Sequence, residues 1–179
     1  MLASLQSFAQ NILSRPNRAN ELLTWLIKRD HLALLNEKAD LSTLLGTGRD
    51  ILNIHALYND TTNTVSEKKC LKNFMTDEEV EMFHLRLSKM KQIKWENSGY
   101  TLPVKYYKNM SFSNNPKGTG TRETFFGLSL PIFLNKEQTR VLIGECFTAD
   151  IAFGRGDVLL CEFKNGKWEI IARVVTWDS

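Results

Sequence analysis

Acidic side chains and histidines are the residues of this chain that could carry out proton transfer. An enzyme would have to assemble its site from acids that are scattered through the last third of the chain and from His84 or His55, with two of the acids facing one cleft. The scattered acids are Glu145, Asp150, Asp157, Glu162 and Glu169. No two of them form a recognisable catalytic pair in sequence, so the sequence assigns no catalytic residue.

The sequence shows no recognisable motif for a nucleophile, a metal or a cofactor. No serine lies in a nucleophile elbow, and no cysteine has a basic partner nearby in sequence. Gly118-Thr119-Gly120 lacks the following lysine and hydroxyl residue, and the preceding strand, that a phosphate-binding loop needs. Cys70, Cys146 and Cys161 show neither a metal-ligand spacing nor a disulfide framework. Three buried free thiols are the simpler interpretation, and one disulfide with a leftover thiol is the alternative. We therefore predict no metal and no cofactor.

Two segments offer candidate binding residues. Residues 111–122 have the composition of a loop, in which Phe112 and Arg122 offer a contact surface. Arg155-Gly156-Asp157 is an integrin-type tripeptide, but chance alone produces it in on the order of a few per cent of chains this long. We expect turn glycines here, with Arg155 exposed and Asp157 opening a strand. Phe112, Arg122, Arg155 and Asp157 are thus the predicted binding residues.

Length and composition are those of an ordinary globular domain. The chain has 179 residues, of which 42% are hydrophobic and 24% charged, and we predict a single domain. The net charge of +3 is mild, and the lysines and arginines are interleaved with acids, so no nucleic acid partner is expected. No apolar run approaches the roughly 20 residues that span a bilayer, so no integral membrane segment is expected. The sequence carries no signal for an oligomeric state.

The elements that must position any site lie mainly between Phe125 and Trp177. Four apolar, β-rich runs with short polar breaks predict an antiparallel meander. Residues 158–161 and 170–175 are apolar at successive positions, which predicts that both faces of the sheet are covered. Pro131 predicts an edge or a bulge in the first run.

Asn165-Gly166 is the sharpest local signal, because these residues supply the two positive φ angles of a type I′ hairpin turn. Glu162 and Glu169 flank this turn. We expect them to be solvent-exposed charges or cross-strand partners of lysines 164 and 167.

Helices are predicted before the sheet. Residues 18–36 carry an amphipathic helical pattern, with a candidate interruption at Asp30-His31, after which the leucines at 32, 34 and 35 continue the apolar face. Residues 77–92 form the second helix, which begins with a capping box between Thr76 and Glu79. Residues 51–58 fit a strand or a short helix, and residues 102–109 fit an edge strand. The predicted fold class is α+β, with N-terminal helices (about 1–95) packed on a C-terminal antiparallel β-meander of four to five strands (about 100–179).

The first residues have two interpretations. Residues 1–9 are uncharged and end in an acceptable cleavage site, as the tail of a secretory signal does. Leu2, Leu5, Phe8 and Ile12 also recur at helical spacing. The first interpretation predicts an exported, periplasmic protein, and the second a cytoplasmic one.

Several structural motifs resemble those of a known family. They are the run 128–133, the strand 141–143, the pair Gly154 and Gly156, the hairpin Asn165-Gly166-Lys167-Trp168 and the closing run 175–179. Over roughly residues 70–179 the chain resembles a family of uncharacterised Bacteroidetes proteins, which often carry a secretion or lipoprotein signal. The resemblance implies an α+β domain and no agreed activity. Many members have a cysteine- and glycine-rich turn where this chain has residues 148–156 without cysteine, so no disulfide or redox role is carried over.

Three hypotheses for function follow, in this order. The first is a non-catalytic binding or interaction protein with a protein partner, such as a cell-envelope component or an immunity-type inhibitor; exposed aromatics without a cleft would favour it. The second is a small-ligand module with an apolar pocket between helices and sheet; a closed cavity would favour it. The third is the enzyme described above; carboxylates and a histidine converging on a cleft, with shifted pKa values, would favour it.

Overall fold

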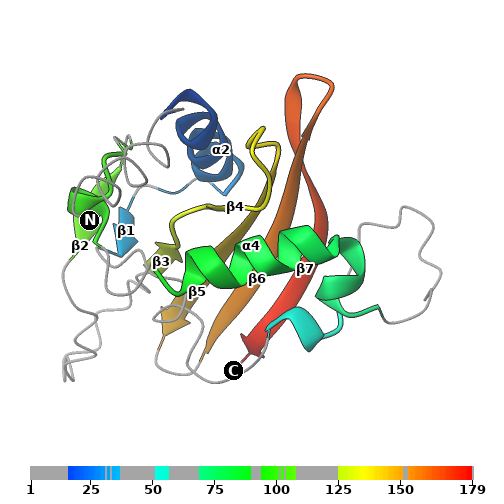
Figure 1. The fold of residues 1–179 in the computed structure, drawn as a ribbon. Helices are drawn as coiled ribbons and strands as arrows, with labels where there is room; N and C mark the ends of the chain where they lie inside the picture. Colours follow the sequence, from blue (N-terminus) through cyan, green and yellow to red (C-terminus); the bar gives the residue numbers. More distant parts are fainter. Residues whose placement is uncertain are drawn as a thin grey trace, which may run out of the picture.

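A computed structural model describes residues 16–30, 32, 34–36, 51–56, 69–89, 94–100, 102, 104–107, 125–150 and 153–178. Its centre is a seven-stranded sheet in the order β2-β1-β3-β5-β6-β7, with β4 paired to β5 beside β3 (Figure 1). The helices are α2 (Pro16–Arg29) and α4 (Asp77–Leu87). The strands are β1 (Leu34–Asn36), β2 (Lys105–Tyr107), β3 (Phe125–Leu128), β4 (Ile132–Phe133), β5 (Arg140–Asp150), β6 (Phe153–Lys164) and β7 (Lys167–Asp178). The predicted α+β class is confirmed.

The C-terminal strands form the predicted antiparallel meander. β3 and β4 pair with β5, β5 with β6, and β6 with β7, all antiparallel. The hairpin between β6 and β7 turns at Asn165 and Gly166, whose φ angles of 51° and 80° are both positive, as a type I′ turn requires. The turn chemistry therefore sets the register of the last two strands, as predicted.

The first run of the meander is interrupted where the proline predicted it. Pro131 lies between β3 and β4, and Ser129 bridges the gap to the neighbouring strand. The backbone N–H of Ser129 donates to the carbonyl of Gly144, and the N–H of Gly144 donates to the Ser129 hydroxyl, both at 2.8 Å. The buried hydroxyl thus replaces a strand carbonyl, so that no buried N–H is left unpaired at this bond.

Successive residues of β5 and β6 are buried on opposite faces of the sheet. Val141, Ile143 and Leu159 belong to the cluster that contains leucines 22, 23 and 26 of α2. Leu142 and Leu160 belong to the cluster that contains Phe83 of α4. Since neighbouring strand residues point to opposite faces, α2 covers one face and α4 the other. The prediction of a sheet covered on both sides is confirmed.

An arginine joins α4 to the sheet. The helix begins with the predicted capping box, in which the Glu79 N–H donates to the Thr76 hydroxyl at 3.2 Å and the Thr76 N–H donates to the Glu79 carboxylate at 3.0 Å. The second Glu79 oxygen accepts from Arg140 Nε at 2.6 Å. Arg140 also donates to Glu162 at 3.0 Å and to the Phe74 carbonyl at 2.5 Å. Glu162 therefore pairs with Arg140 and not with a lysine of the hairpin, which corrects that part of the prediction.

The N-terminal part differs from the sequence prediction. α2 ends at Arg29, and residues 34–36 are strand β1, parallel to both β2 and β3. The prediction that Leu32, Leu34 and Leu35 continue the helix is wrong, because a short apolar run also fits a strand once two neighbours are in place to pair with it. A strand of the sheet thus comes from within the part predicted to be helical.

Other predicted elements are shorter than expected. α4 ends at Leu87, and residues 51–53 form one 3-10 turn, after which His55 makes an isolated bridge with Cys70. β2 lies at the edge of the sheet, as predicted for residues 102–109. None of the described helices is long and apolar enough to cross a membrane. The alternatives for residues 1–12 and the predicted loop 111–122 lie outside the described residues.

Candidate functional site

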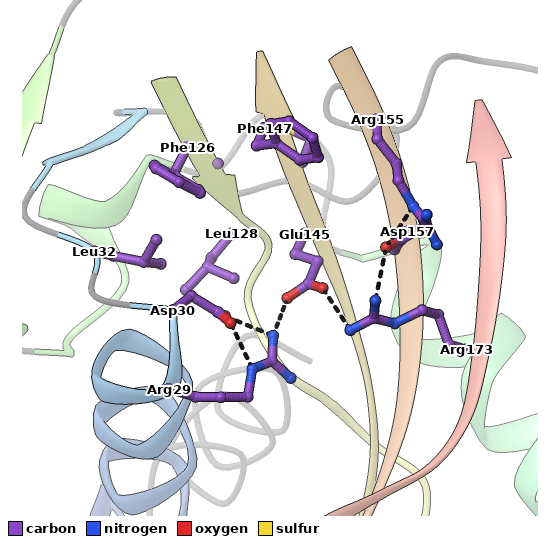
Figure 2. A pocket seen from close by; sticks show the side chains of 12 residues that line it. Arg29, Asp30, Leu32, Phe126, Leu128, Glu145, Phe147, Arg155, Asp157 and Arg173 are labelled. Carbon is purple, nitrogen blue, oxygen red and sulfur yellow. Dashed lines mark hydrogen bonds and ion pairs between the residues drawn. The ribbon is translucent and has the colours of Figure 1, made fainter. Parts of the chain in front are cut away.

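A pocket of about 460 Å³ opens where the C-terminal end of α2 meets strands β3, β5 and β6. Its polar lining comprises six residues, which we call the charge chain: Asp30, Arg29, Glu145, Arg173, Asp157 and Arg155. Its apolar lining includes Leu32, Leu128 and two phenylalanines, Phe126 and Phe147, which we call the aromatic pair (Figure 2). The volume lies in the range of small-ligand pockets, roughly 300–1,000 Å³.

Strand register brings these side chains together in two rows. Leu128 pairs with Glu145, and Glu145 pairs with Asp157, across β3, β5 and β6. Two residues further along each strand, Phe126 pairs with Phe147 and Phe147 with Arg155. Because side chains alternate between faces, both rows point to the α2 face. We call the row with Glu145 and Asp157 the polar row, and the row with Phe126 and Phe147 the aromatic row. The two rows lie side by side in one pocket.

The other members of the charge chain come from α2 and β7. Arg29 is the last residue of α2, where a positive charge is favoured by the helix dipole, and Asp30 follows it. The Asp30 N–H donates to the Leu26 carbonyl at 3.0 Å, which holds the helix end in place. Arg173 pairs in register with Leu159 and so lies on the α2 face as well.

The six charges alternate in sign along the chain (Figure 2). Arg29 donates to both oxygens of Asp30, at 2.6 and 2.5 Å, and to Glu145 at 2.6 Å. Arg155 Nε lies 2.8 and 3.0 Å from the two oxygens of Asp157. Arg173 connects the halves more loosely, with its nitrogens 3.4 Å from Glu145 and 3.6 Å from Asp157. The ion pairs of Arg173 are therefore the longest in the charge chain.

Arg173 also reduces the repulsion between two carboxylates of the sheet. Glu145 and Asp157 stand directly opposite each other on β5 and β6, and like charges in such a pair repel. Asp157 is buried, with only 6% of its side chain exposed, so water cannot screen this repulsion well. A cation between the two carboxylates offsets the repulsion.

Burial shapes the protonation of the pocket groups. Burial raises the pKa of Glu145 above its ordinary value, in spite of the attraction from Arg29 and Arg173. Burial opposes the charge of Arg29 as well, but its hydrogen bond with Asp30 and the attraction of Glu145 and Asp30 outweigh it and raise the pKa of Arg29. Burial also raises the pKa of Cys146 to about 11, so its side chain is a neutral thiol at neutral pH.

One buried nitrogen atom of the charge chain lacks a hydrogen-bond partner. Nη1 of Arg29 is buried and has no hydrogen-bond partner among the described residues. An unsatisfied buried donor costs about 1–3 kcal/mol. The guanidinium thus keeps an unused donor next to the pocket.

Two of the four predicted binding residues, Arg155 and Asp157, lie in this pocket and bind each other. Phe112 and Arg122 lie outside the described residues. The expectation of turn glycines with an exposed arginine is wrong, because residues 154–157 lie inside β6 and Arg155 is half-buried. Gly156 pairs with Cys146 in the ladder, so the tripeptide is not displayed on a loop as adhesion would require.

Of the residues in the enzyme hypothesis, Glu145 and Asp157 meet in the pocket, but neither histidine joins them. His84 lies exposed on α4, with its ring against Phe83 at 5.4 Å, and His55 is exposed beside Cys70. Neither lines the pocket. Among the described residues no group of three or more His, Cys, Asp or Glu side chains is placed to hold a metal ion. The three cysteines are free, and of these only Cys161 is fully buried.

Sequence reasoning missed Arg29, Asp30 and Arg173 as site residues. Arg173 offered a signal, since it is the one charge in the otherwise apolar run 170–175. Such a charge needs a partner when its face of the sheet is covered. Arg29 and Asp30 offered none, because charges at a helix end are common.

Comparison with protein-family models, with curated proteins and with solved structures finds no match to this chain, so the resemblance to the Bacteroidetes family stays a prediction.

Proposed function

We propose that this is a non-catalytic binding protein that takes a small ligand into the pocket between α2 and strands β3, β5 and β6. The observation that carries the proposal is a pocket of about 460 Å³ whose polar row and aromatic row lie side by side. Ligand pockets combine an apolar wall with a few placed polar groups, and this lining has both.

A non-catalytic role is supported by the state of the pocket groups. Each carboxylate of the charge chain is within ion-pair distance of an arginine, and the Cys146 side chain is a neutral thiol at neutral pH. A general base must be able to reach a substrate proton, and a nucleophile must be activated. The carboxylates are instead paired with arginines, and the thiol is not activated.

The pocket is open and carries six charged side chains, so it differs from the closed apolar cavity that the ligand-module hypothesis predicted. Its concave shape still favours that hypothesis over the protein-partner hypothesis that the sequence ranked first. Phe147 is an aromatic side chain that is 39% exposed, and it lines the pocket. It therefore belongs to a concave site and not to a flat aromatic patch.

A thermal-shift screen of common metabolites, confirmed by titration calorimetry, tests the proposal. We expect compounds that raise the melting temperature of the wild type but not of Phe147→Ala, because a ligand stabilises the fold that binds it. Leu85→Ala is the matched control, since Leu85 is exposed on α4, away from the pocket. The proposal fails if no compound stabilises the wild type, or if every stabilising compound acts equally on Phe147→Ala.

A further inference from the structure

We infer that the ligand is a zwitterion with an apolar side chain, of the class of free α-amino acids. The inference rests on the proposed function and adds the chemistry of the ligand. It is based on the alternation of positive and negative side chains in the charge chain, whose ends are Asp30 and Arg155, and on the aromatic pair beside it.

Charge balance selects against ligands with a single charge. The described lining holds three arginines and three carboxylates. An anion drawn to Arg173 also meets Glu145 and Asp157, and a cation drawn to those acids also meets the arginines that hold them. In a partly desolvated pocket such like-charge contacts are costly. A ligand that carries both charges avoids them.

The loose connection at Arg173 is where a zwitterion fits. The Arg173 contacts of 3.4 and 3.6 Å are longer than good hydrogen bonds, and 36% of its side chain is exposed. An ammonium group can insert between Glu145 and Arg173, whose contact is 3.4 Å, while Arg173 stays beside Asp157. Arg173 then receives the ligand carboxylate in the two-pronged geometry that guanidinium groups favour.

This insertion keeps the alternation of charge intact. The order becomes glutamate, ligand ammonium, ligand carboxylate and Arg173, so every charge still has opposite neighbours. An ion of one sign cannot do this, because it would place two like charges in succession.

The apolar side chain of the ligand has a defined place. The aromatic pair lies two residues further along the strands than Glu145, at a distance of about 7 Å. The two rings have centroids 6.4 Å apart and are tilted by 34°. With Leu32 and Leu128 they form the apolar wall of the pocket. The distance between rows suits one side chain that branches from the carbon bearing the ammonium group.

Titration calorimetry with probes that share one phenyl body tests the inference. The probes are L-phenylalanine (zwitterion), phenethylamine (cation), hydrocinnamate (anion) and phenethyl alcohol (neutral), with L-leucine as a second zwitterion. We expect at least one of the two amino acids to bind, and L-phenylalanine, where it binds, to do so about tenfold more tightly than any of its three analogues.

Two variants assign the charges. Arg173→Gln should weaken the binding of the amino acid while leaving that of phenethylamine unchanged or tighter. Glu145→Gln should weaken both. Lys167→Gln, which removes an exposed cation beside the hairpin turn, is the matched control and should change neither. Arg173→Lys keeps the charge and guards against a folding defect in Arg173→Gln, and it should retain part of the affinity.

The possible failures are distinct. If phenethyl alcohol or a single ion binds as tightly as the amino acid, the zwitterion inference is wrong while a ligand pocket stands. If neither amino acid binds, the inference is wrong, and the metabolite screen decides separately on the proposed function. If the amino acid binds but Arg173→Gln and Glu145→Gln bind it as the wild type does, it does not use the charge chain, and the inference is wrong.

Discussion

At the scale of single residues, the charge chain shows how a sheet tolerates two facing carboxylates. Glu145 and Asp157 oppose each other on β5 and β6, and each is held by an arginine from its other side, Arg29 and Arg155. Arg173 sits between them at longer range. Removing one of these charges takes a partner from its neighbours in a partly buried site, so we expect substitutions here to lower stability.

Glu145 gives a pH prediction with a definite sign. Because burial raises its pKa, the folded protein holds the Glu145 proton more tightly than the unfolded chain does. The stabilisation from that proton is complete below the unfolded-state pKa and is lost as the pH rises through the folded-state pKa. Urea unfolding of the wild type and of Glu145→Gln between about pH 4 and pH 7 should show the stability of the wild type, relative to the variant, falling as the pH rises.

Glu169 supplies a control of opposite sign. The hydrogen bond from Lys167 lowers the pKa of this exposed carboxyl group. Its stabilising effect is present above the unfolded-state pKa and is lost as the pH falls through the folded-state pKa. The stability of the wild type relative to Glu169→Gln should therefore rise with pH. If the Glu145 comparison also rose with pH, pairing with arginine would outweigh burial at that residue.

At the scale of elements, Arg140 fastens the start of α4 to the sheet. Its three hydrogen bonds reach a capping carboxylate, a strand carboxylate and a backbone carbonyl. Glu79, with 8% of its side chain exposed, serves both the capping box and this ion pair. One buried carboxylate thus ties helix initiation to helix docking.

Arg140→Met should lower the free energy of unfolding by about 3 kcal/mol, because it leaves the buried Glu79 carboxylate without its cation. Lys167→Met is the control: its ion pair with Glu169 is exposed and screened by water, so its loss should change the stability far less. Denaturant unfolding measures both. Equal effects of the two substitutions would show that Arg140 does not fasten the helix.

The hairpin turn offers a test of backbone conformation alone. A Cβ atom at Gly166 would meet nothing within 4 Å, yet its φ is 80°. Gly166→Ala should therefore cost about 1 kcal/mol through backbone strain and not through a clash. Lys164→Ala, just before the turn, should change stability by less than about 0.5 kcal/mol. A neutral Gly166→Ala would mean that the turn adopts another conformation.

At the scale of the whole molecule, the sheet is a buried layer between two helices. Leu159 and Leu160 are neighbours in β6, both fully buried, and they point to the α2 face and to the α4 face respectively. This arrangement explains why the central strands are apolar at successive positions.

Leu159→Ala and Leu160→Ala should each lower the free energy of unfolding by about 2–5 kcal/mol, since each leaves a cavity in a packed layer. Leu85→Ala, at a residue that is 46% exposed, should cost less than about 0.5 kcal/mol. Chemical denaturation of the three variants provides the measurement. A small effect at either buried leucine would contradict the cover on that face.

Features that depend on residues close together in the sequence were predicted, whereas features that depend on distant residues were not. Asn165-Gly166 and Thr76 with Glu79 act over one to three residues, so their turn and capping box were predicted correctly. Leu34 and Leu35 were assigned to a helix because their strand exists only through pairing with β2 and β3. Arg155 and Asp157 were chosen for a loop motif that the strand removes, although both do line the pocket.

Local chemistry in the chain settles the meander, the hairpin register and the start of α4, because propensity and apolar periodicity act between near neighbours. The pocket belongs to the tertiary structure alone. Arg29 and Glu145 are 116 positions apart, and only the packing of α2 on the sheet brings their charges within 2.6 Å. Interactions between such distant positions leave no periodic trace in a sequence, so the site is decided by how the layers come together.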